Sequence, residues 1–198
     1  MRVRPQCYKR VMPASPAPPD SSALPLDRLP PTDDEGNLRA VIEACRGSRN
    51  KLKYQPSLRA FELHAVLPLG TSFPWDFGFI PSTRGDDGDP IDVLVLMDEA
   101  VPAGTVVPCR LVGVIEAEQR DEGAKKPVRN DRLLAVAASS HRYGQCRRLA
   151  DLTPAVLDQI ESFFVSYNRQ RGGDFRPLGR GGVQQARRLV EAATKAAG

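Results

Sequence analysis

Short apolar segments separated by Gly, Pro and Asp fill most of the chain between residues 38 and 138. Segments of this length that are rich in Val, Ile, Leu and Phe, with such residues between them, predict β-strands. A basic stretch, RGSRNKLK at 46–53, is expected to be a loop that runs into one further strand. The other expected strands are LRAVIEAC at 38–45, FELHAVLP at 61–68, FGFIP at 77–81, IDVLVLM at 91–97, VVPCRLVGVIEAE at 106–118 and RLLAVAA at 132–138.

Two helices are predicted near the end of the chain. Thr153 followed by Pro154 is a typical N-cap and first-turn pair. The first helix should follow it, because apolar side chains recur there every three or four residues. A second stripe predicts a helix from Val183 to about Ala196. The two apolar stripes are Leu157, Ile160, Phe164 and Tyr167, and then Val183, Ala186, Leu189, Val190 and Ala193.

These elements predict one domain over residues 37–198. Many short strands followed by two helices indicate an α+β, mainly β fold, in which a small β-barrel carries the helices on its outside. The preceding segment has a different character, since eight of the 18 prolines fall within residues 1–31 and no hydrophobic period is visible there. Proline removes a hydrogen-bond donor and fixes φ, so we expect residues 1–36 to be an unstructured extension.

Composition narrows the class of protein. Hydrophobic residues at 41% and charged residues at 26% allow a buried core, and no apolar run is long enough to span a membrane. The basic start MRVRPQCYKR lacks the apolar region of a secretion signal. The cysteines lack CxxC spacing, so we expect free thiols in a cytoplasmic protein. The net charge of +4 suits a phosphate-rich ligand and a nucleic acid equally well.

The segment GDDGDPIDVLVLM at 85–97 places four aspartates in seven positions, directly before and within an apolar strand. Three of them, Asp86, Asp87 and Asp89, are compatible with a solvated loop. Asp92 lies inside the apolar segment, where an unpaired carboxylate would be costly to bury. Hard divalent cations such as Mg²⁺ remove this cost, because they prefer carboxylate oxygens. This pattern alone fits a metal site and an acidic turn equally well.

A longer stretch around this turn, FPWDFGFIPSTRGDDGDPIDVLVLMDE at 73–99, strongly resembles the signature region of soluble family I inorganic pyrophosphatases. In that family an aromatic-Gly-aromatic-Ile segment precedes a D-x-D-P-x-D motif, and the resemblance extends from about Val41 to Tyr167. It implies a five-stranded barrel of OB-like topology with helices outside. It also implies Mg²⁺-dependent hydrolysis of pyrophosphate to two phosphates by a metal-activated water, with Mn²⁺ as a substitute, and a homo-oligomer.

The resemblance also implies roles for acidic residues. Asp87, Asp89 and Asp92 match the metal-binding aspartates of the motif, and Asp89 matches the base for the attacking water. Upstream, EACRGSRNK at 43–51 resembles the family segment E-I-P-x-G-S-x-x-K. That match implies that Glu43 is an active-site carboxylate and a further metal ligand.

Three other residues are expected to bind the phosphates. The match of EACRGSRNK implies phosphate binding and a catalytic role for Lys51, with Arg49 nearby to neutralise charge. Tyr167, in FFVSYN, falls where the family has a phosphate-binding tyrosine. Without the resemblance, the sequence around Lys51 favours a solvated basic loop, and Tyr167 is also compatible with a core position. We expect the two histidines, His64 and His141, to be structural or surface residues.

Several positions depart from the family's pattern. Lys53 stands where an acid is common, and Ala65 stands where a phosphate-binding arginine is usual. Phe77 replaces a tyrosine, and Asn168 replaces a lysine.

A second acidic cluster of the family is also altered. The corresponding region, GVIEAEQRDEGAKKPVRNDRLLAV, is longer and more basic than expected, and Asn130 and Arg132 occupy the positions of an expected D-x-K. We expect Arg132 to bind substrate. Either Glu118 (or Glu116) and Asp131 supply the missing metal ligands, or fewer metal ions bind and the substrate differs.

Three functions therefore stay open from the sequence. The first is hydrolysis of pyrophosphate, and the second is hydrolysis of another phosphoanhydride, such as a short polyphosphate or a nucleotide. The third is a basic OB-like module that binds nucleic acid without hydrolysis, which two RGG triplets in RGGDFRPLGRGG suggest. We expect that segment to be a loop between the two helices. The third function is the least favoured, because the aspartates would repel a phosphate backbone.

Overall fold

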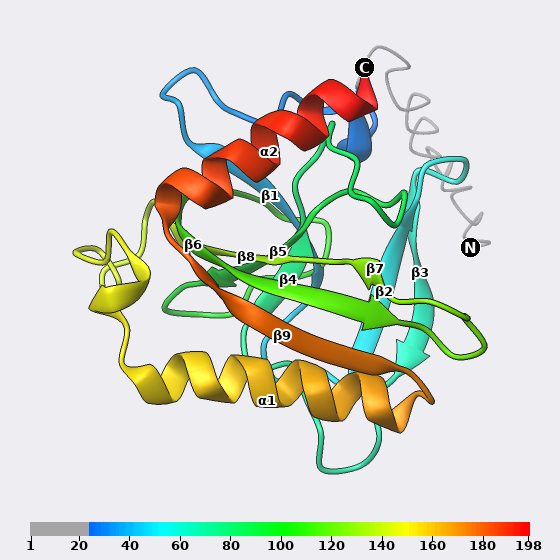
Figure 1. Cartoon of the computed structure of the whole chain (residues 1–198). Coiled ribbons are helices and arrows are strands. Elements are labelled where there is room, and N and C mark those ends of the chain that lie inside the picture. The colour runs from blue at the N-terminus through cyan, green and yellow to red at the C-terminus, as the bar shows by residue number, and fades with distance from the viewer. Residues whose placement is uncertain (1–23) are drawn as a thin grey trace, which may run out of the picture.

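The computed structural model describes residues 24–198, so the first 23 residues of the expected extension lie outside the described part. The described chain is mainly β, with two α-helices near its end (Figure 1). The strands are β1 (Leu38–Ala44), β2 (Asn50–Gln55), β3 (Ala60–Val66), β4 (Asp76–Phe79), β5 (Asp92–Leu96), β6 (Val106–Arg120), β7 (Val128–Arg129), β8 (Arg132–Ala137) and β9 (Asp174–Gly181). The helices are α1 (Pro154–Gln170) and α2 (Val183–Ala197), with short 3-10 helices η1 (Leu26–Arg28) and η2 (Leu149–Asp151).

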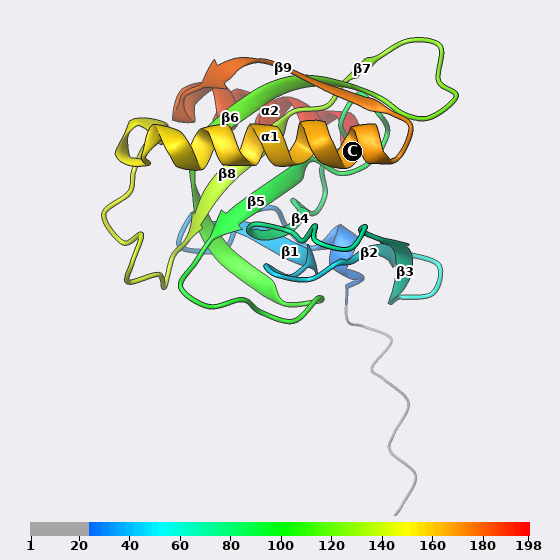
Figure 2. The same ribbon diagram turned by 90° about the horizontal axis from the view of Figure 1, so that it is seen from below.

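Five strands close into a ring, in agreement with the predicted OB-like barrel. Strands β1, β4, β5, β8 and β6 pair in this order, and β6 then pairs back to β1. The long strand β6 also carries β7 and β9, while β2 and β3 form a separate hairpin. Helices α1 and α2 lie on opposite sides of these strands, as Figures 1 and 2 show. The α+β, mainly β prediction is therefore confirmed.

Alternation along the strands produces two buried layers. Leu94 and Leu96 of β5 belong to the layer that α1 covers, whereas Val93 and Val95 belong to the layer that α2 covers. Successive side chains of a strand point to opposite faces, so a strand buried on both faces reads as a continuous apolar run. Gly78 of β4 is required by close pairing, because a Cβ atom there would lie 1.9 Å from the backbone oxygen of β1. The four apolar positions predicted for α1 are all buried.

One prediction about this part of the chain is wrong. The segment RGGDFRPLGRGG, expected to be a loop, contains strand β9, which pairs with β6 from Asp174 to Gly181. Pro177 lies where the β6–β9 register shifts, which is a position that tolerates a residue without an N–H group. Thr153 precedes α1 as predicted, without a side-chain capping bond, and Pro154 is the first helical residue.

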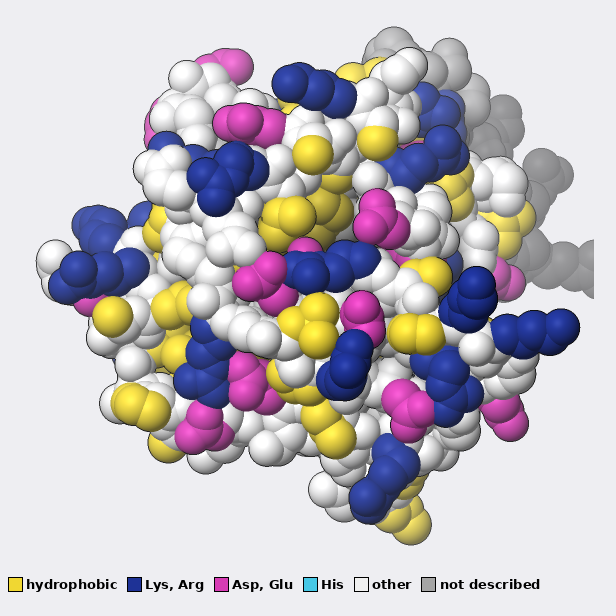
Figure 3. Space-filling model, in the orientation of Figure 1, with side chains coloured by type: hydrophobic (Ala, Val, Ile, Leu, Met, Phe, Trp, Pro, Cys, Tyr) yellow, Lys and Arg dark blue, Asp and Glu magenta, His cyan; other side chains and the backbone are white. Residues whose placement is uncertain are grey.

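The start of the described chain contacts the domain. The Ser82 N–H group donates a hydrogen bond to the Asp27 carbonyl, 2.9 Å away, and the Arg39 N–H group donates to Pro31 at 2.8 Å. The boundary expected at residue 36 stays a prediction. No helix of residues 24–198 is long and apolar enough to cross a membrane. Figure 3 shows basic and acidic side chains interspersed over the face that α2, β6 and β9 form.

Candidate active site

The acidic turn, residues 85–92, joins β4 to β5 and is held together by its own backbone. Gly88 has a φ of +89°, which L side chains rarely adopt. The Gly85 N–H group donates to the Asp89 carbonyl at 2.7 Å, and the Asp89 N–H group donates to the Asp87 carboxylate at 3.1 Å. Asp92 is then the first residue of β5. The spacing of the aspartates therefore fixes three carboxylates on one short, constrained segment.

Each of these three carboxylates binds a side chain from a distant part of the chain. The partners come from β2, from the start of β8 and from the residue pair between β7 and β8. Such long-range pairs are set by the fold, and they fix the orientation of the turn. The pairs are Lys53 Nζ to Asp89 Oδ2 at 2.7 Å, Arg132 Nη1 to Asp92 Oδ2 at 2.8 Å, and Asn130 Nδ2 to Asp87 Oδ2 at 2.8 Å.

These contacts have different electrostatic consequences. Partial burial raises the pKa of Asp87, and the neighbouring charges of Asp92 and Asp89 add to that shift. Partial burial acts to lower the pKa of Lys53, but the hydrogen bond and charge of Asp89, together with Glu43, raise it overall. Lys53 is therefore held as a cation beside the turn.

Glu43, the last but one residue of β1, is a buried carboxyl group next to the turn. Burial raises its pKa to about 7, and the charge of Asp92 acts in the same direction. The Tyr54 N–H group, which donates to Glu43 Oε1 at 2.9 Å, and the charges of Lys51 and Lys53 oppose the shift. A carboxyl group that titrates near neutral pH can both give and accept a proton.

Lys51 and Tyr167 are brought together, as the resemblance implies. The Lys51 ammonium group lies 5.8 Å from the ring centroid of Phe77 and 5.8 Å from that of Tyr167, distances that allow cation–π attraction. The Tyr167 hydroxyl group accepts a hydrogen bond of 2.7 Å from Arg171 Nη1. The end of α1 and strand β2 therefore present two cations and one hydroxyl group to the same region.

His64 belongs to this region too. The β2–β3 register shifts between Lys51 and Leu52, and this bulge leaves His64 without a paired residue. Burial and the positive charges of Lys51, Arg171 and Lys53 lower the pKa of His64. His64 is exposed, as a surface residue was expected to be, but it lies among the basic side chains of the candidate site.

Arg49 has a different environment. Its Nε donates to the Leu67 carbonyl at 2.9 Å, and the Leu67 N–H group donates back to the Arg49 carbonyl at 2.7 Å. These bonds join the start of the hairpin to its end. The contacts of Arg49 thus support the hairpin that carries Lys51, and its binding of substrate stays a prediction.

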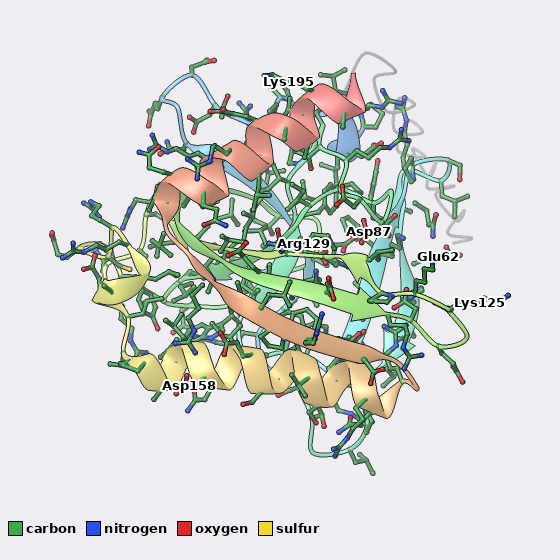
Figure 4. All side chains as sticks on the ribbon, in the orientation of Figure 1. Glu62, Asp87, Lys125, Arg129, Asp158 and Lys195 are labelled. Atoms are coloured by element: carbon green, nitrogen blue, oxygen red, sulfur yellow. The ribbon has the colours of Figure 1, made fainter. Side chains whose placement is uncertain are left out.

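The acids of the second region are bound by arginines. Arg129 of β7 pairs with Glu116 and, at 2.6 Å, with Asp131, and Arg176 of β9 pairs with Glu118 at 2.5 Å. Figure 4 labels Arg129 and Asp87, which line one pocket of about 160 Å³ beneath α2. It also shows Lys125 at the tip of the loop between β6 and β7, away from that pocket. No hydrogen bond or ion pair of the described residues joins Glu118 or Asp131 to the three aspartates, although Asp131 lines the same pocket as Asp87.

Alternation of side chains explains which residues reach the turn. Asn130 and Arg132 bind Asp87 and Asp92, whereas Asp131 between them binds Arg129, because successive side chains of an extended chain point to opposite sides. Arg132 is only 4% exposed. Its guanidinium carbon lies 5.0 Å and 5.4 Å from the ring centroids of Phe164 and Phe175.

The residues of the site do not fit a cage for several metal ions. Among residues 24–198, no group of three or more His, Cys, Asp and Glu side chains is arranged to hold a metal ion. Each of Asp87, Asp89 and Asp92 is bound to an amide or a cation instead. A hard divalent cation needs several oxygen ligands, and here the free oxygens are few.

Three residues for which no role was expected, Lys53, Asn130 and Arg171, also lie at the site. Lys53 could have been found, because it follows Lys51 by two residues on a strand and therefore shares its face. Arg171 follows Tyr167 by four residues, the spacing of neighbours on a helix. Asn130 occupies the first position of the expected D-x-K, which could have indicated that it lies at the site.

Comparison with known proteins gives consistent results for sequence and fold. A family model described as inorganic pyrophosphatase matches residues 40–197. An inorganic pyrophosphatase from Nostoc sp. is 35% identical over 173 residues, which cover 87% of this chain and 99% of that protein. The crystal structure of an inorganic pyrophosphatase from Thermus thermophilus gives a TM-score of 0.79 at 32% identity, covering 88% of this chain and 99% of that one. An inorganic pyrophosphatase from Helicobacter pylori gives 0.75 at 31% identity, covering 85% and 98%.

Proposed function

The chain belongs to the inorganic pyrophosphatase family, and we propose that the acidic turn and the cations around Lys51 form its active site. As a member of this family it is an inorganic diphosphatase, a hydrolase that converts pyrophosphate to two phosphates, and it depends on divalent cations. We take the cation to be Mg²⁺, with Mn²⁺ as a substitute, because hard ions bind phosphate and carboxylate oxygens. The observation that carries the proposal is the convergence of the charges of Asp92, Lys51 and Lys53 on the buried Glu43, with Asp89 bound to Lys53.

In this proposal, cations bind the substrate. Lys51, fixed over the rings of Phe77 and Tyr167, and Arg171, bound to the Tyr167 hydroxyl group, offset the negative charge of the two phosphates. Lys53 stands on the same strand face as Lys51 and extends this positive region towards the turn. Positioning and charge neutralisation supply most of the catalysis in phosphoryl transfer.

Asp89 is the proposed base. Its side chain is 58% exposed, so water reaches it, and Lys53 fixes its orientation. The water oxygen forms a bond to phosphorus while the bridging P–O bond breaks, and the proton of the water passes to Asp89. The leaving phosphate carries the electron pair of the broken bond. Arg132 is buried and bound to Asp92, the first residue of β5, and its binding of substrate stays a prediction.

The test is phosphate release by the purified full-length chain. Release from pyrophosphate should require added Mg²⁺ or Mn²⁺ and should stop when a chelator is added. Triphosphate and ATP, assayed at the same concentration, should give a kcat/KM lower than that of pyrophosphate by at least about 10-fold. A folded protein that prefers triphosphate or ATP would contradict the proposed substrate.

The nucleic-acid alternative gains no support from the arginines that suggested it. One RGG triplet precedes β9 and the other begins inside it at Arg180, which is paired with Glu161 at 2.7 Å and Asp158 at 2.5 Å. The face that β9 shares with α2 and β6 carries both signs of charge (Figure 3). A backbone-binding surface needs a continuous positive stripe.

A homo-oligomer is part of the proposal. Large apolar side chains are exposed on the β2–β3 hairpin and just after it, with Leu58 at 62%, Leu63 at 59% and Leu69 at 86%. Clusters of such side chains commonly mark interfaces. Light scattering should therefore give a mass above that of one chain, and Leu63→Lys should lower it. We also propose a cytoplasmic location, because Cys45, Cys109 and Cys146 are free thiols.

A further inference from the structure

The side chains that bind the acidic turn are themselves mostly cations. Lys53 and Arg132 bring two positive charges to Asp89 and Asp92, at 2.7 Å and 2.8 Å. Asn130 gives Asp87 a neutral donor at 2.8 Å. Two of the four aspartates of the turn therefore have their charge offset by the chain itself, at contact distance.

These cations compete with a metal ion for the same oxygens. An ammonium or guanidinium group donates hydrogen bonds along the lone pairs that a hard cation would use. A divalent ion bound at Asp89 or Asp92 would also lie close to a like charge, which disfavours its binding.

Arg132 cannot move aside to relieve this competition. It is buried, lies against the rings of Phe164 and Phe175, and donates from Nη2 to Gln119 at 2.8 Å. A guanidinium group is not deprotonated in proteins. The positive charge beside Asp92 is therefore permanent.

The acids of the second region do not compensate. Glu116 and Asp131 share Arg129, and Glu118 is bound to Arg176. Each of these carboxylates already has a cation at contact distance, although Asp131 and Arg129 line the same pocket as Asp87.

We propose that Lys53 and Arg132 replace protein-bound metal ions as counter-charges of the acidic turn, so that the divalent cation enters the site as its complex with pyrophosphate. Mg²⁺ is commonly held by one or two carboxylates plus substrate phosphates, and this arrangement requires no complete protein cage. The first half of this inference, that the two cations replace bound metal ions, concerns the substrate-free chain alone. The second half, that the divalent cation enters with pyrophosphate, rests on the proposed function.

The first half is tested by calorimetric titration of the full-length, substrate-free protein with Mg²⁺ and separately with Mn²⁺. The wild-type chain should show no site with a dissociation constant below about 1 mM. Lys53→Glu, which exchanges the cation for an acid, should tighten metal binding by at least about 10-fold, and adding Asn130→Asp should tighten it further. Lys126→Glu makes the same charge change on the exposed loop between β6 and β7 and should leave metal binding as in the wild type.

Two or more ions bound to the wild-type chain at micromolar concentration would overturn the inference. So would equal gains in affinity for Lys53→Glu and Lys126→Glu, because the effect would then be one of net charge. If Lys53→Glu fails the check of its fold by circular dichroism, the wild-type titration still decides the question.

The second half is tested by initial rates at a constant concentration of the magnesium–pyrophosphate complex. Raising free Mg²⁺ tenfold should change the rate less than about twofold, because free ions have no cage to fill. A rate that climbs steeply with free Mg²⁺ would overturn it. No hydrolysis at any Mg²⁺ concentration would refute the proposed function instead, and the titration of the substrate-free chain would stay interpretable.

Discussion

The acidic turn and the segment 116–132 carry similar numbers of carboxylates but use them differently. In the turn, the three partners of Asp87, Asp89 and Asp92 come from distant segments, and Asp89 stays 58% exposed. In the segment 116–132, Glu116, Glu118 and Asp131 are bound by arginines of the neighbouring strands β7 and β9. Asp89 of the turn is therefore available to a ligand from solution, whereas the paired acids of the segment 116–132 stabilise the contacts between β6, β7 and β9.

Whether a side chain of the segment 130–132 binds the turn depends on a shift of one residue along the chain. Asn130 and Arg132 bind aspartates of the turn, whereas Asp131 between them binds Arg129, since alternate residues of an extended chain share a side. The presence of an acid in a segment therefore does not make it a ligand of the site. Which side of the extended segment an acidic side chain points to decides which groups it can bind.

The largest expected effect is a loss of pyrophosphate turnover after a substitution in the acidic turn. Asp89→Asn should lower turnover of pyrophosphate by at least about 100-fold, because a general base contributes that much or more. The free energy of unfolding of the Asp89→Asn protein should change by less than about 1 kcal/mol, because the pair of Asp89 with Lys53 is partly exposed. Asp86→Asn in the same turn is the control and should retain activity. Full activity of Asp89→Asn would remove the assigned base.

The next largest effect is a loss of folding stability, which should differ between substitutions of Arg132 and Arg176. Arg132→Met should lower the free energy of unfolding by about 3–5 kcal/mol, because it leaves the carboxylate of Asp92 without its buried partner. Arg176→Met, which removes an arginine that is 70% exposed, should cost less than about 1 kcal/mol. Urea unfolding measures both. Equal losses would contradict the distinction between a buried and an exposed pair.

Glu43 should make stability depend on pH. Its pKa of about 7 in the folded state lies above the ordinary value of 4.5, so the folded chain holds the proton more tightly than the unfolded chain. The resulting stabilisation is complete below pH 4.5 and is lost as pH rises through 7, by roughly 3 kcal/mol in all. Urea unfolding in a chelator, between these pH values, should show that Glu43→Gln flattens the slope. An unchanged slope would assign it to other groups.

The smallest effect is expected at Glu118. Glu118→Gln should leave turnover within about twofold and stability within about 1 kcal/mol, because its partner Arg176 lies largely in solvent. The same assays as for Asp89→Asn apply. A loss of activity as large as that of Asp89→Asn would place Glu118 in the active site after all.

Local patterns predicted most of the fold. The apolar stripes located α1 and α2, and the apolar runs located every strand of the ring, because each element satisfies its own period. Strand β9 was missed because its glycines and Pro177 are typical of loops. Pairing with the long strand β6 overrides that preference.

The turn was predicted from its own sequence, and Glu43, Lys51 and Tyr167 from the resemblance, but the partners of the turn were not predicted as its partners. The turn reads directly from 85–92, whereas Lys53 meets Asp89 across 36 residues and Asn130 meets Asp87 across 43. Such pairs depend on strand register, which the sequence of either segment alone does not contain. The roles of the partners therefore required the fold.

The most direct test of the central claim, that this chain hydrolyses pyrophosphate at the acidic turn by attack of water, is ³¹P NMR of the wild-type reaction in H₂¹⁸O with Mg²⁺ present. The account predicts that pyrophosphate disappears and that one of its two product phosphates carries a single ¹⁸O atom. Under the same conditions, Asp89→Asn should leave the pyrophosphate signal unchanged. Persistence of pyrophosphate with the folded wild-type protein, or equal consumption by Asp89→Asn, would contradict it.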